Sequence, residues 1–250
     1  MTTGGRQRFI AIVFLATASA AHGQAVTVVT ESFPPYNYTD EASGARMGLG
    51  TEMVQALLAE VGLDAEIQEF PWARAYAMAQ DQPGVLIYSM KRNADRETKF
   101  KWVGQIVISE AYLVALKGTT IAPSARLDDF KRYRVGAVQA GANARQLAAD
   151  GFPNVVLFGE RETCWLRLRT GHIDLWCTDI LSARFYARKA GDDPSLAVSL
   201  IRYEALSREG LWVAFSPGTD DVLVERFRQA WKRLEERGVL AAILARYAGR

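Results

Sequence analysis

The sequence predicts an α/β protein of two lobes, each a mostly parallel sheet flanked by helices, with a hinge of two strands between them. First, β-branched runs alternate with helically spaced segments early in the chain, which is the order of a βαβ series. Second, the alternation restarts later in the chain. Third, two apolar segments, 110–117 and 210–215, separate the two series and are interpreted as the crossing strands. The expected lobes are 25–114 with 212–250, and 115–211.

The N-terminal residues 1–24 have the pattern of a secretory signal peptide. Arg6 and Arg8 give a positive start, an apolar run covers 9–16, and small residues follow at 18–21. The apolar run is too short for a helix that spans a bilayer. Because no cysteine stands near the cleavage region, we expect a periplasmic protein without a lipid anchor.

The first lobe begins with a β-branched run, typical of a strand. Pro34 and Pro35 come after it, and proline cannot continue a β ladder. Apolar residues then recur at helical spacing from Thr51 to Gly62, a residue type common just after a helix. The expected elements are strand 26–30, helix 51–62, strand 65–70, helix 71–80 and strand 85–88.

The second lobe repeats this alternation of short apolar runs and helically spaced segments. Its expected strands are 133–138, 155–158, 173–177 and 196–201. Its expected helices are 141–149, 162–170 and 181–190. Two closing helices, 220–237 and 239–247, are expected to return to the first lobe, which is therefore made of both chain ends.

The composition argues against several classes of function. The formal charge of +2 includes Arg6 and Arg8, so the mature chain is near neutral and nucleic-acid binding is not indicated. His172 is the only histidine after the signal peptide and is not spaced with co-ligands. No metal site, Ser-His-Asp set or phosphate-binding glycine pattern is therefore predicted, and we expect no cofactor.

The two cysteines, Cys164 and Cys177, are expected to form a disulfide. An even number of cysteines in an exported chain favours a bond. Helix 162–170 and strand 173–177 are joined by a tight turn and run antiparallel, so the start of the helix comes to the height of the strand's end. Two buried thiols are the alternative.

The sequence is organised around strand 85–88 and the cationic stretch that follows it. Ser89, Lys91 and Arg96 come after the strand, and ligands in open α/β sheets collect beyond the carboxyl ends of strands. An arginine there offers a planar fork of donors that suits a carboxylate. A solvated basic turn is the alternative.

Three short segments carry a resemblance to a known family. Residues 93–96, Asn-Ala-Asp-Arg, stand where the family has Thr-Pro-Glu-Arg. The family's Gly-Arg-Ile-Asp-Ala segment appears here as Gly-His-Ile-Asp-Leu at residues 171–175. Its Gln-x-Gly-Thr-Thr segment appears as Gln-Ala-Gly-Ala-Asn at residues 139–143. The chain thus resembles the family 3 periplasmic solute-binding proteins of the polar amino-acid type over essentially its whole mature length. The resemblance implies the two-lobed periplasmic-binding-protein fold, with a small-molecule ligand between the lobes.

The resemblance also implies roles for single residues. Arg96 matches the arginine that holds the ligand carboxylate, and Ser89 matches a residue that assists it. Asp179 matches the acidic residue that takes the ligand ammonium, and an aspartate at that place can cap a helix as well. Phe33 and Trp72 fall at the aromatic positions that sandwich the ligand side chain.

Several positions depart from the family pattern. Lys91 adds positive charge after the central strand, and Asn143 replaces a hydroxyl residue. Arg74 stands at the start of a helix that is expected to face the same cleft. These changes widen the expected ligand from an amino acid to a dicarboxylate or another organic acid. Glu31 completes the expected ligand-binding set.

The leading interpretation is a monomeric periplasmic receptor that passes a small carboxylate-bearing ligand to the membrane permease of an importer. The first alternative is an enzyme of the cyclohexadienyl dehydratase kind on the same fold. Two carboxylates of its substrate would then meet Arg96, Arg74 and Lys91. Glu31 or Asp179 would be the general acid. The second alternative is a sensor input protein that acts through a separate partner.

Overall fold

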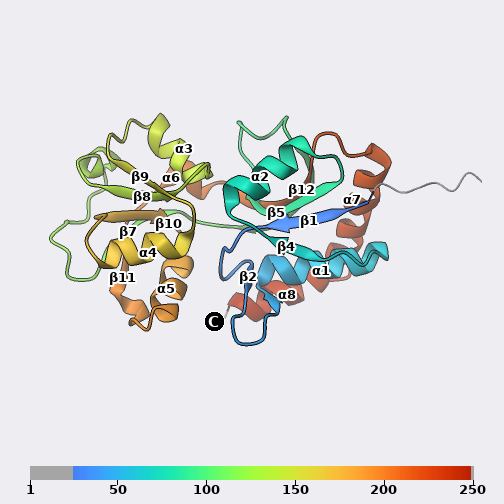
Figure 1. Cartoon of the computed structure of the whole chain (residues 1–250), viewed down its shortest axis with the longest axis horizontal. Coiled ribbons are helices and arrows are strands. Elements are labelled where there is room, and N and C mark those ends of the chain that lie inside the picture. The colour runs from blue at the N-terminus through green and yellow to red at the C-terminus, as the bar shows by residue number, and fades with distance from the viewer. Residues whose placement is uncertain (1–24, 249–250) are drawn as a thin grey trace, which may run out of the picture.

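A computed structural model describes residues 25–248, which form two lobes side by side (Figure 1). The α/β fold class is confirmed, because each lobe has a five-stranded sheet with helices around it. The expected signal peptide, 1–24, lies outside the described residues. Within residues 25–248, no helix combines the length and apolar character that a membrane crossing requires.

The first sheet has the strand order β4-β1-β5-β12-β6. Its members are β1 (Thr27–Thr30), β4 (Ile67–Glu69), β5 (Val85–Lys91), β6 (Lys101–Ile108) and β12 (Gly210–Phe215). Strand β1 is parallel to both β4 and β5, whereas β12 is antiparallel to β5 and β6. The carboxyl ends of β1 and β5 therefore meet at one edge, where parallel sheets collect ligands.

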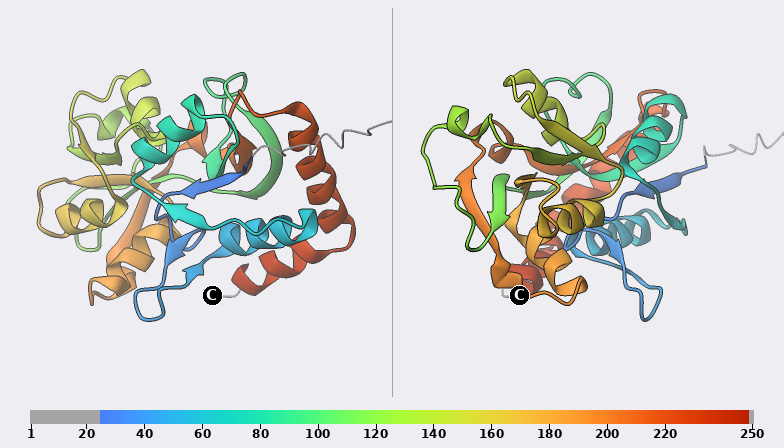
Figure 2. Two further views of the ribbon diagram at one scale, coloured as in Figure 1. Left: turned by 45° about the vertical axis from the view of Figure 1, so that its right-hand side comes forward. Right: turned by 60° about the vertical axis from the view of Figure 1, so that its left-hand side comes forward.

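Helices cover both faces of the first sheet. The helices of this lobe are α1 (Leu49–Val61), α2 (Trp72–Asp81), α7 (Asp221–Glu236) and α8 (Val239–Ala248). The first, third and fourth of these share one apolar core, and α2 packs on the opposite face. Figure 2 shows α7 and α8, in red, beside α1. Helix α1 is followed by Gly62, whose φ of 66° is a conformation that glycine adopts without strain.

The second sheet has the order β11-β7-β10-β8-β9. Its strands are β7 (Tyr112–Leu116), β8 (Val135–Val138), β9 (Val155–Phe158), β10 (Leu175–Thr178) and β11 (Ala197–Arg202). Its α-helices are α3 (Ala142–Ala149), α4 (Arg161–Arg169), α5 (Ile180–Lys189) and α6 (Glu204–Ser207). Strand β8 is parallel to β9 and β10, while β7 is antiparallel to β10 and β11. Smaller elements are β2 (Tyr38–Thr39), β3 (Arg46–Met47), η1 (Leu127–Phe130) and η2 (Pro194–Leu196).

The chain crosses between the sheets twice, once between β6 and β7 and once between α6 and β12. The two crossings touch, because the Ser207 hydroxyl accepts from the Ala111 amide at 3.0 Å and donates to its carbonyl at 3.1 Å. Strand β7 lies in the second sheet from Tyr112, and β12 lies in the first from Gly210. The expected lobe boundaries at 114/115 and 211/212 stay predictions.

Strand β6 was not expected from the sequence, where its start was interpreted as part of a cationic stretch. It pairs with β12 and lies under α7, whose Trp231 crosses the strand at Gly104. A Cβ on Gly104 would lie 2.3 Å from the Trp231 ring. The glycine therefore allows the helix to approach the sheet closely.

We expect Gly104→Ala to destabilise the protein, because either the strand or the indole must move. Overpacking of this kind costs about 1–3 kcal/mol, which lowers Tm by several degrees in a chain of this size. Gly159→Ala is the matched control, since a Cβ there meets no atom within 4 Å. If thermal unfolding gives the two variants equal Tm values, this close approach does not contribute to stability.

The expected disulfide is wrong, because Cys164 and Cys177 are both buried and unpaired. Cys164 packs in the apolar cluster that contains Trp176, whereas Cys177 packs in the cluster on the other side of the sheet. Successive strand residues point to opposite faces, so Cys177 points away from the face on which α4 lies. The two residues were expected at similar heights, but they lie on opposite sides of the sheet.

We now expect two free thiols per chain. Burial raises the pKa of each thiol to about 12, so alkylation of the native protein at neutral pH should be very slow. Unfolding in denaturant without reductant should expose both thiols to a titrating reagent, and reductant should leave Tm unchanged. If no thiol can be titrated in the purified protein under those conditions, Cys164 and Cys177 form a disulfide after all.

Candidate functional site

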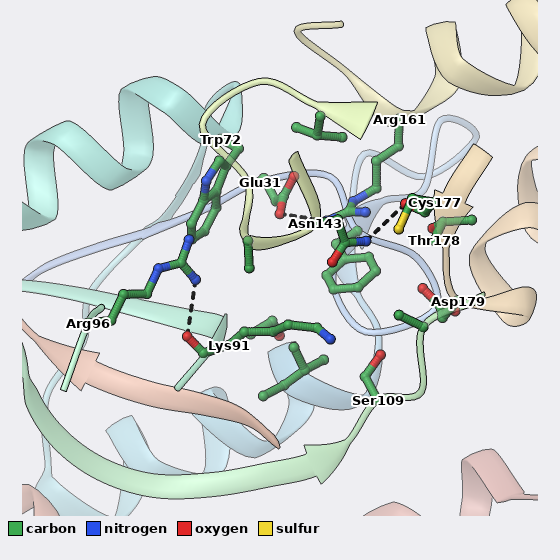
Figure 3. Close-up of a pocket in the computed structure, with 17 residues that line it drawn as sticks. Glu31, Trp72, Lys91, Arg96, Ser109, Asn143, Arg161, Cys177, Thr178 and Asp179 are labelled. Atoms are coloured by element: carbon green, nitrogen blue, oxygen red, sulfur yellow. Dashed lines mark hydrogen bonds and ion pairs between the residues drawn. The ribbon is translucent and has the colours of Figure 1, made fainter. Parts of the chain in front are cut away.

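A cavity lies between the two lobes, where β1, β5 and β10 end and where α2, α3 and α5 begin (Figure 3). All but one of the ligand-binding residues expected from the sequence line it: Glu31, Phe33, Trp72, Ser89, Lys91, Arg96, Asn143 and Asp179. The exception is Arg74, which is exposed and stacks on Phe70 at 4.1 Å instead. Polar lining residues that were not expected to bind a ligand include Ser109, Arg161 and Thr178, and Cys177, which was expected in a disulfide, also lines the cavity.

Arg96 is almost completely buried, with 1% of its surface exposed. Its guanidinium lies 5.1 Å from the Trp72 ring and 5.0 Å from the Tyr76 ring, and its Nη1 donates to the Lys91 carbonyl at 3.0 Å. Its Nε and Nη2 have no hydrogen-bond partner among residues 25–248. Burial, with the nearby charge of Arg145, lowers the pKa of Arg96 to about 10. The group remains a cation at neutral pH with donors to offer.

The backbone is strained at two cavity-side positions. Ser89 and Ala140 have φ values of 55° and 58°, the left-handed region that side-chain-bearing residues rarely adopt. The buried Ser89 hydroxyl has no partner in the described part of the chain. The Ala140 carbonyl accepts from Trp72 Nε1 at 3.0 Å, a hydrogen bond between the lobes. Strain of this kind gathers at ligand sites, because the surrounding structure must hold it.

Asp179 stands at the N-terminus of α5 and faces the same cavity. Its Oδ1 accepts from the Ser182 amide at 2.8 Å, so the residue caps the helix. Its Oδ2 is buried and has no partner within residues 25–248. Burial raises the pKa of this carboxyl, while Ser182 and Arg161 oppose the shift. One oxygen is thus structural and the other is available.

Lys91 and Asn143 extend into the cavity from opposite lobes (Figure 3). The Lys91 ammonium donates to the Leu206 carbonyl, and burial lowers its pKa to about 8. Asn143 Nδ2 donates to the Cys177 carbonyl at 2.9 Å, which fixes the start of α3 against β10. Lys91 can therefore switch between charged and neutral forms close to physiological pH.

Arg161 is the main cavity residue that sequence reasoning missed. It begins α4, and its Nη2 pairs with Glu31 Oε1 at 2.9 Å, with both side chains about nine-tenths buried. Its guanidinium lies 3.6 Å from the centre of the Phe33 ring. Burial raises the pKa of Glu31, and the charge of Arg161 opposes that shift. The pair joins the two lobes beside the cavity.

Further contacts close the lobes on one another. The Ser182 hydroxyl donates to the Pro34 carbonyl at 2.5 Å, and Lys189 pairs with Glu41 at 2.8 Å. The Tyr38 and Phe185 rings lie 4.9 Å apart. These contacts therefore link the first lobe to α5 of the second. Within residues 25–248, no group of three or more histidine, cysteine, aspartate or glutamate side chains is placed to hold a metal.

Comparison with known proteins places this geometry in a family. Residues 26–250 match the family model described as bacterial extracellular solute-binding proteins, family 3. No curated protein matches the chain. A histidine kinase sensor domain with similarity to periplasmic binding proteins has a similar structure, with a TM-score of 0.79 at 19% identity over 91% of this chain and 97% of that one.

Two binding proteins of solved structure are also similar. An ancestral arginine-binding protein bound to arginine has a TM-score of 0.77 at 19% identity over 90% of this chain and 99% of that one. The arginine-, lysine-, histidine-binding protein ArtJ from Geobacillus stearothermophilus has a TM-score of 0.75 at 18% identity over 90% and 96%. Identities this low support the shared fold and no particular ligand. Because the family model spans nearly all of the sequence, the chain belongs to the bacterial extracellular solute-binding proteins, family 3.

Proposed function

We propose that the protein is a periplasmic receptor that captures a small carboxylate-bearing solute, an amino acid in the first instance, between its lobes. The observation that carries this proposal is a pair of buried charged groups on opposite sides of one cavity, each with polar atoms that have no partner among residues 25–248 (Figure 3). Arg96 offers two donors from the first lobe, and Asp179 offers one oxygen from the second. Buried polar atoms without partners are rare in proteins, so a ligand that supplies the partners is the simplest explanation.

The chemistry of the two groups matches the two ends of an α-amino acid. A guanidinium with adjacent free N–H groups binds a carboxylate in a planar, bidentate manner. The free amides at the start of α3 lie at the same cavity and favour the same negative charge. The unpartnered Asp179 oxygen suits an ammonium. Phe33 and Trp72 add apolar surface for the rest of the ligand.

Ligand capture of this kind works through closure of the hinge between the lobes. The ligand stabilises the closed form only if it binds that form better than the open one. Arg96 and Asp179 come from different lobes, so a ligand that bridges them meets this condition. The closed surface then serves as the docking signal for a membrane permease, to which a monomeric receptor delivers its solute.

An enzyme of the dehydratase kind would need a free general acid in the cavity. Glu31 is already paired with Arg161, so of the two candidate acids only Asp179 keeps an unpartnered oxygen, and the proposal assigns that oxygen to the ligand ammonium. Arg74, which was expected to hold a second substrate carboxylate, lies outside the cavity. These contacts favour binding over catalysis. Incubation with prephenate or arogenate should therefore give no aromatic product.

A thermal-shift screen over amino acids and organic acids tests the proposal. A solute at about one hundred times its Kd stabilises the folded protein by about 2.7 kcal/mol, which raises Tm by about 5–10 °C in a chain of this size. We expect at least one carboxylate-bearing solute to do so. If no member of the screen shifts Tm, or only solutes without a carboxylate do, the proposal is wrong.

We expect the affinity for an anionic solute to fall as pH rises through about 8. Lys91 is a cation below that pKa and neutral above it, and only the cation attracts a carboxylate. The groups that act on its charge are Glu209, Cys177, Asp179 and Arg161. Calorimetric titrations across this pH range should show the fall in the wild type and none in Lys91→Met. An equal fall in both proteins would assign the pH dependence to another group.

A further inference from the structure

We infer that Arg161 occupies, from within the protein, the place where a basic ligand side chain would stack, so that the cavity selects solutes with two carboxylates. This inference rests on the receptor function proposed above. It specifies the class of solute: an acidic amino acid, or a dicarboxylate of similar length, rather than arginine or lysine.

Arg161 is held by an aromatic face and a carboxylate, while its buried Nε has no partner among residues 25–248. The guanidinium lies flat over the Phe33 ring at 3.6 Å and pairs with the Glu31 carboxylate at 2.9 Å. An aromatic face and a carboxylate are the two partners that recognise a guanidinium best. Both partners come from the first lobe, and Arg161 reaches them from α4 of the second lobe. A cationic ligand side chain that sought the same ring face and carboxylate would therefore meet Arg161 there.

The charges that remain then favour an acidic ligand. With Glu31 and Arg161 paired, the other ionic groups that line the cavity are Arg96, Lys91 and Asp179. Two cations and one anion complement a solute with two carboxylates and one ammonium. Arg145 adds positive charge nearby, because its guanidinium lies 5.4 Å from the Tyr76 ring that Arg96 also contacts.

The same arrangement rejects basic solutes. A second cation near Arg161 would lose its water and find the carboxylate of Glu31 already used. Like charges brought together in a desolvated site oppose binding, which is a means of specificity by repulsion. A neutral side chain of equal length meets neither attraction nor repulsion. Glutamine is therefore the natural reference ligand for the test.

Calorimetry on the wild-type protein gives the first test. The ligands are L-glutamate, L-aspartate and succinate, with L-glutamine as the neutral reference and L-arginine and L-lysine as basic ones. We expect the best acidic ligand to bind about tenfold or more tightly than glutamine, and the basic ligands not to bind measurably. A wild type that binds arginine as tightly as glutamate would overturn the inference but leave the receptor function intact. Failure of every carboxylate-bearing ligand would instead count against the receptor function.

Variants of Arg161 give the second test. Arg161→Ala exposes the Phe33 face and frees Glu31, so it should gain binding to L-arginine and agmatine and lose its preference for acidic ligands. Arg161→Met keeps the length of the side chain and should bring the affinities for glutamate and glutamine closer together. Arg167→Ala, an exposed residue of the same helix, is the matched control and should keep the wild-type pattern. Folded Arg161 variants that keep that pattern would overturn the inference. If they fail to fold, the wild-type ligand profile still decides.

Discussion

Replacing Arg96 by alanine is expected to abolish measurable ligand binding while the protein stays folded. Removing one partner of a desolvated charge pair costs roughly 2–5 kcal/mol, which is about 30-fold to several-thousand-fold in affinity. The Arg96 side chain donates one hydrogen bond, to the Lys91 carbonyl, while its Nε and Nη2 are unpartnered among the described residues. Alanine loses the packing on Trp72 and Tyr76, but it also removes a buried charge with unpartnered donors, so the two effects oppose each other. Circular dichroism should therefore still show a folded protein.

Arg74→Ala is the matched control for this experiment. Arg74 belongs to the same lobe and the same residue type, but it is exposed and lies over Phe70 outside the cavity. Its loss should leave the affinity of the solute unchanged in a calorimetric titration. If Arg96→Ala binds a confirmed solute as tightly as Arg74→Ala does, Arg96 is not the carboxylate ligand.

The second large effect is expected at Asp179. Asp179→Asn should lower the affinity for amine-bearing solutes by about 10-fold to 150-fold, because a hydrogen bond to a charged group contributes about 1.5–3 kcal/mol. The asparagine oxygen can still accept from the Ser182 amide, so the cap of α5 is kept. The affinity for an analogue without the amine, such as glutarate in place of glutamate, should fall much less. The measurement is a pair of titrations for each protein.

Asp193→Asn tests whether loss of a capping carboxylate is enough to explain the effect. Asp193 caps η2 through the Ser195 amide and is not among the residues that line the cavity. It should leave both ligand classes unaffected. Equal losses for glutamate and glutarate in Asp179→Asn would mean that Asp179 only caps its helix and takes no ammonium.

Local patterns were sufficient to predict most of the fold. The β-branched run at β1, the helical spacing that stops at Gly62 and the buried run of β5 all depend on neighbours in sequence. Strand β6 was missed because it begins at Lys101, and a lysine in a cationic stretch is typical of a solvated turn. Lys101 instead forms an ion pair with Asp221 at the start of α7. That partner lies far along the chain, where no local pattern reveals it.

The residues of the cavity likewise fall into those that local patterns predict and those that they do not. Arg96 and Asp179 both follow the carboxyl ends of strands, where ligands of α/β sheets bind. The positions of the strands therefore predict that both residues lie near the ligand. Arg161 opens a run of charged residues that resembles an ordinary exposed helix start. Only the approach of the second lobe to Glu31 and Phe33 makes it a buried residue. The disulfide failed for a related reason, since the face to which Cys177 points was not considered.

The most direct measurement is a crystal structure of the protein grown with the solute that raises its Tm the most. The solute is expected in the cavity between the lobes. Its carboxylate should lie within hydrogen-bond distance of Arg96 Nε and Nη2, and its amine, if present, should lie on Asp179 Oδ2. A solute bound elsewhere, or in the cavity with no contact to Arg96, would contradict the account.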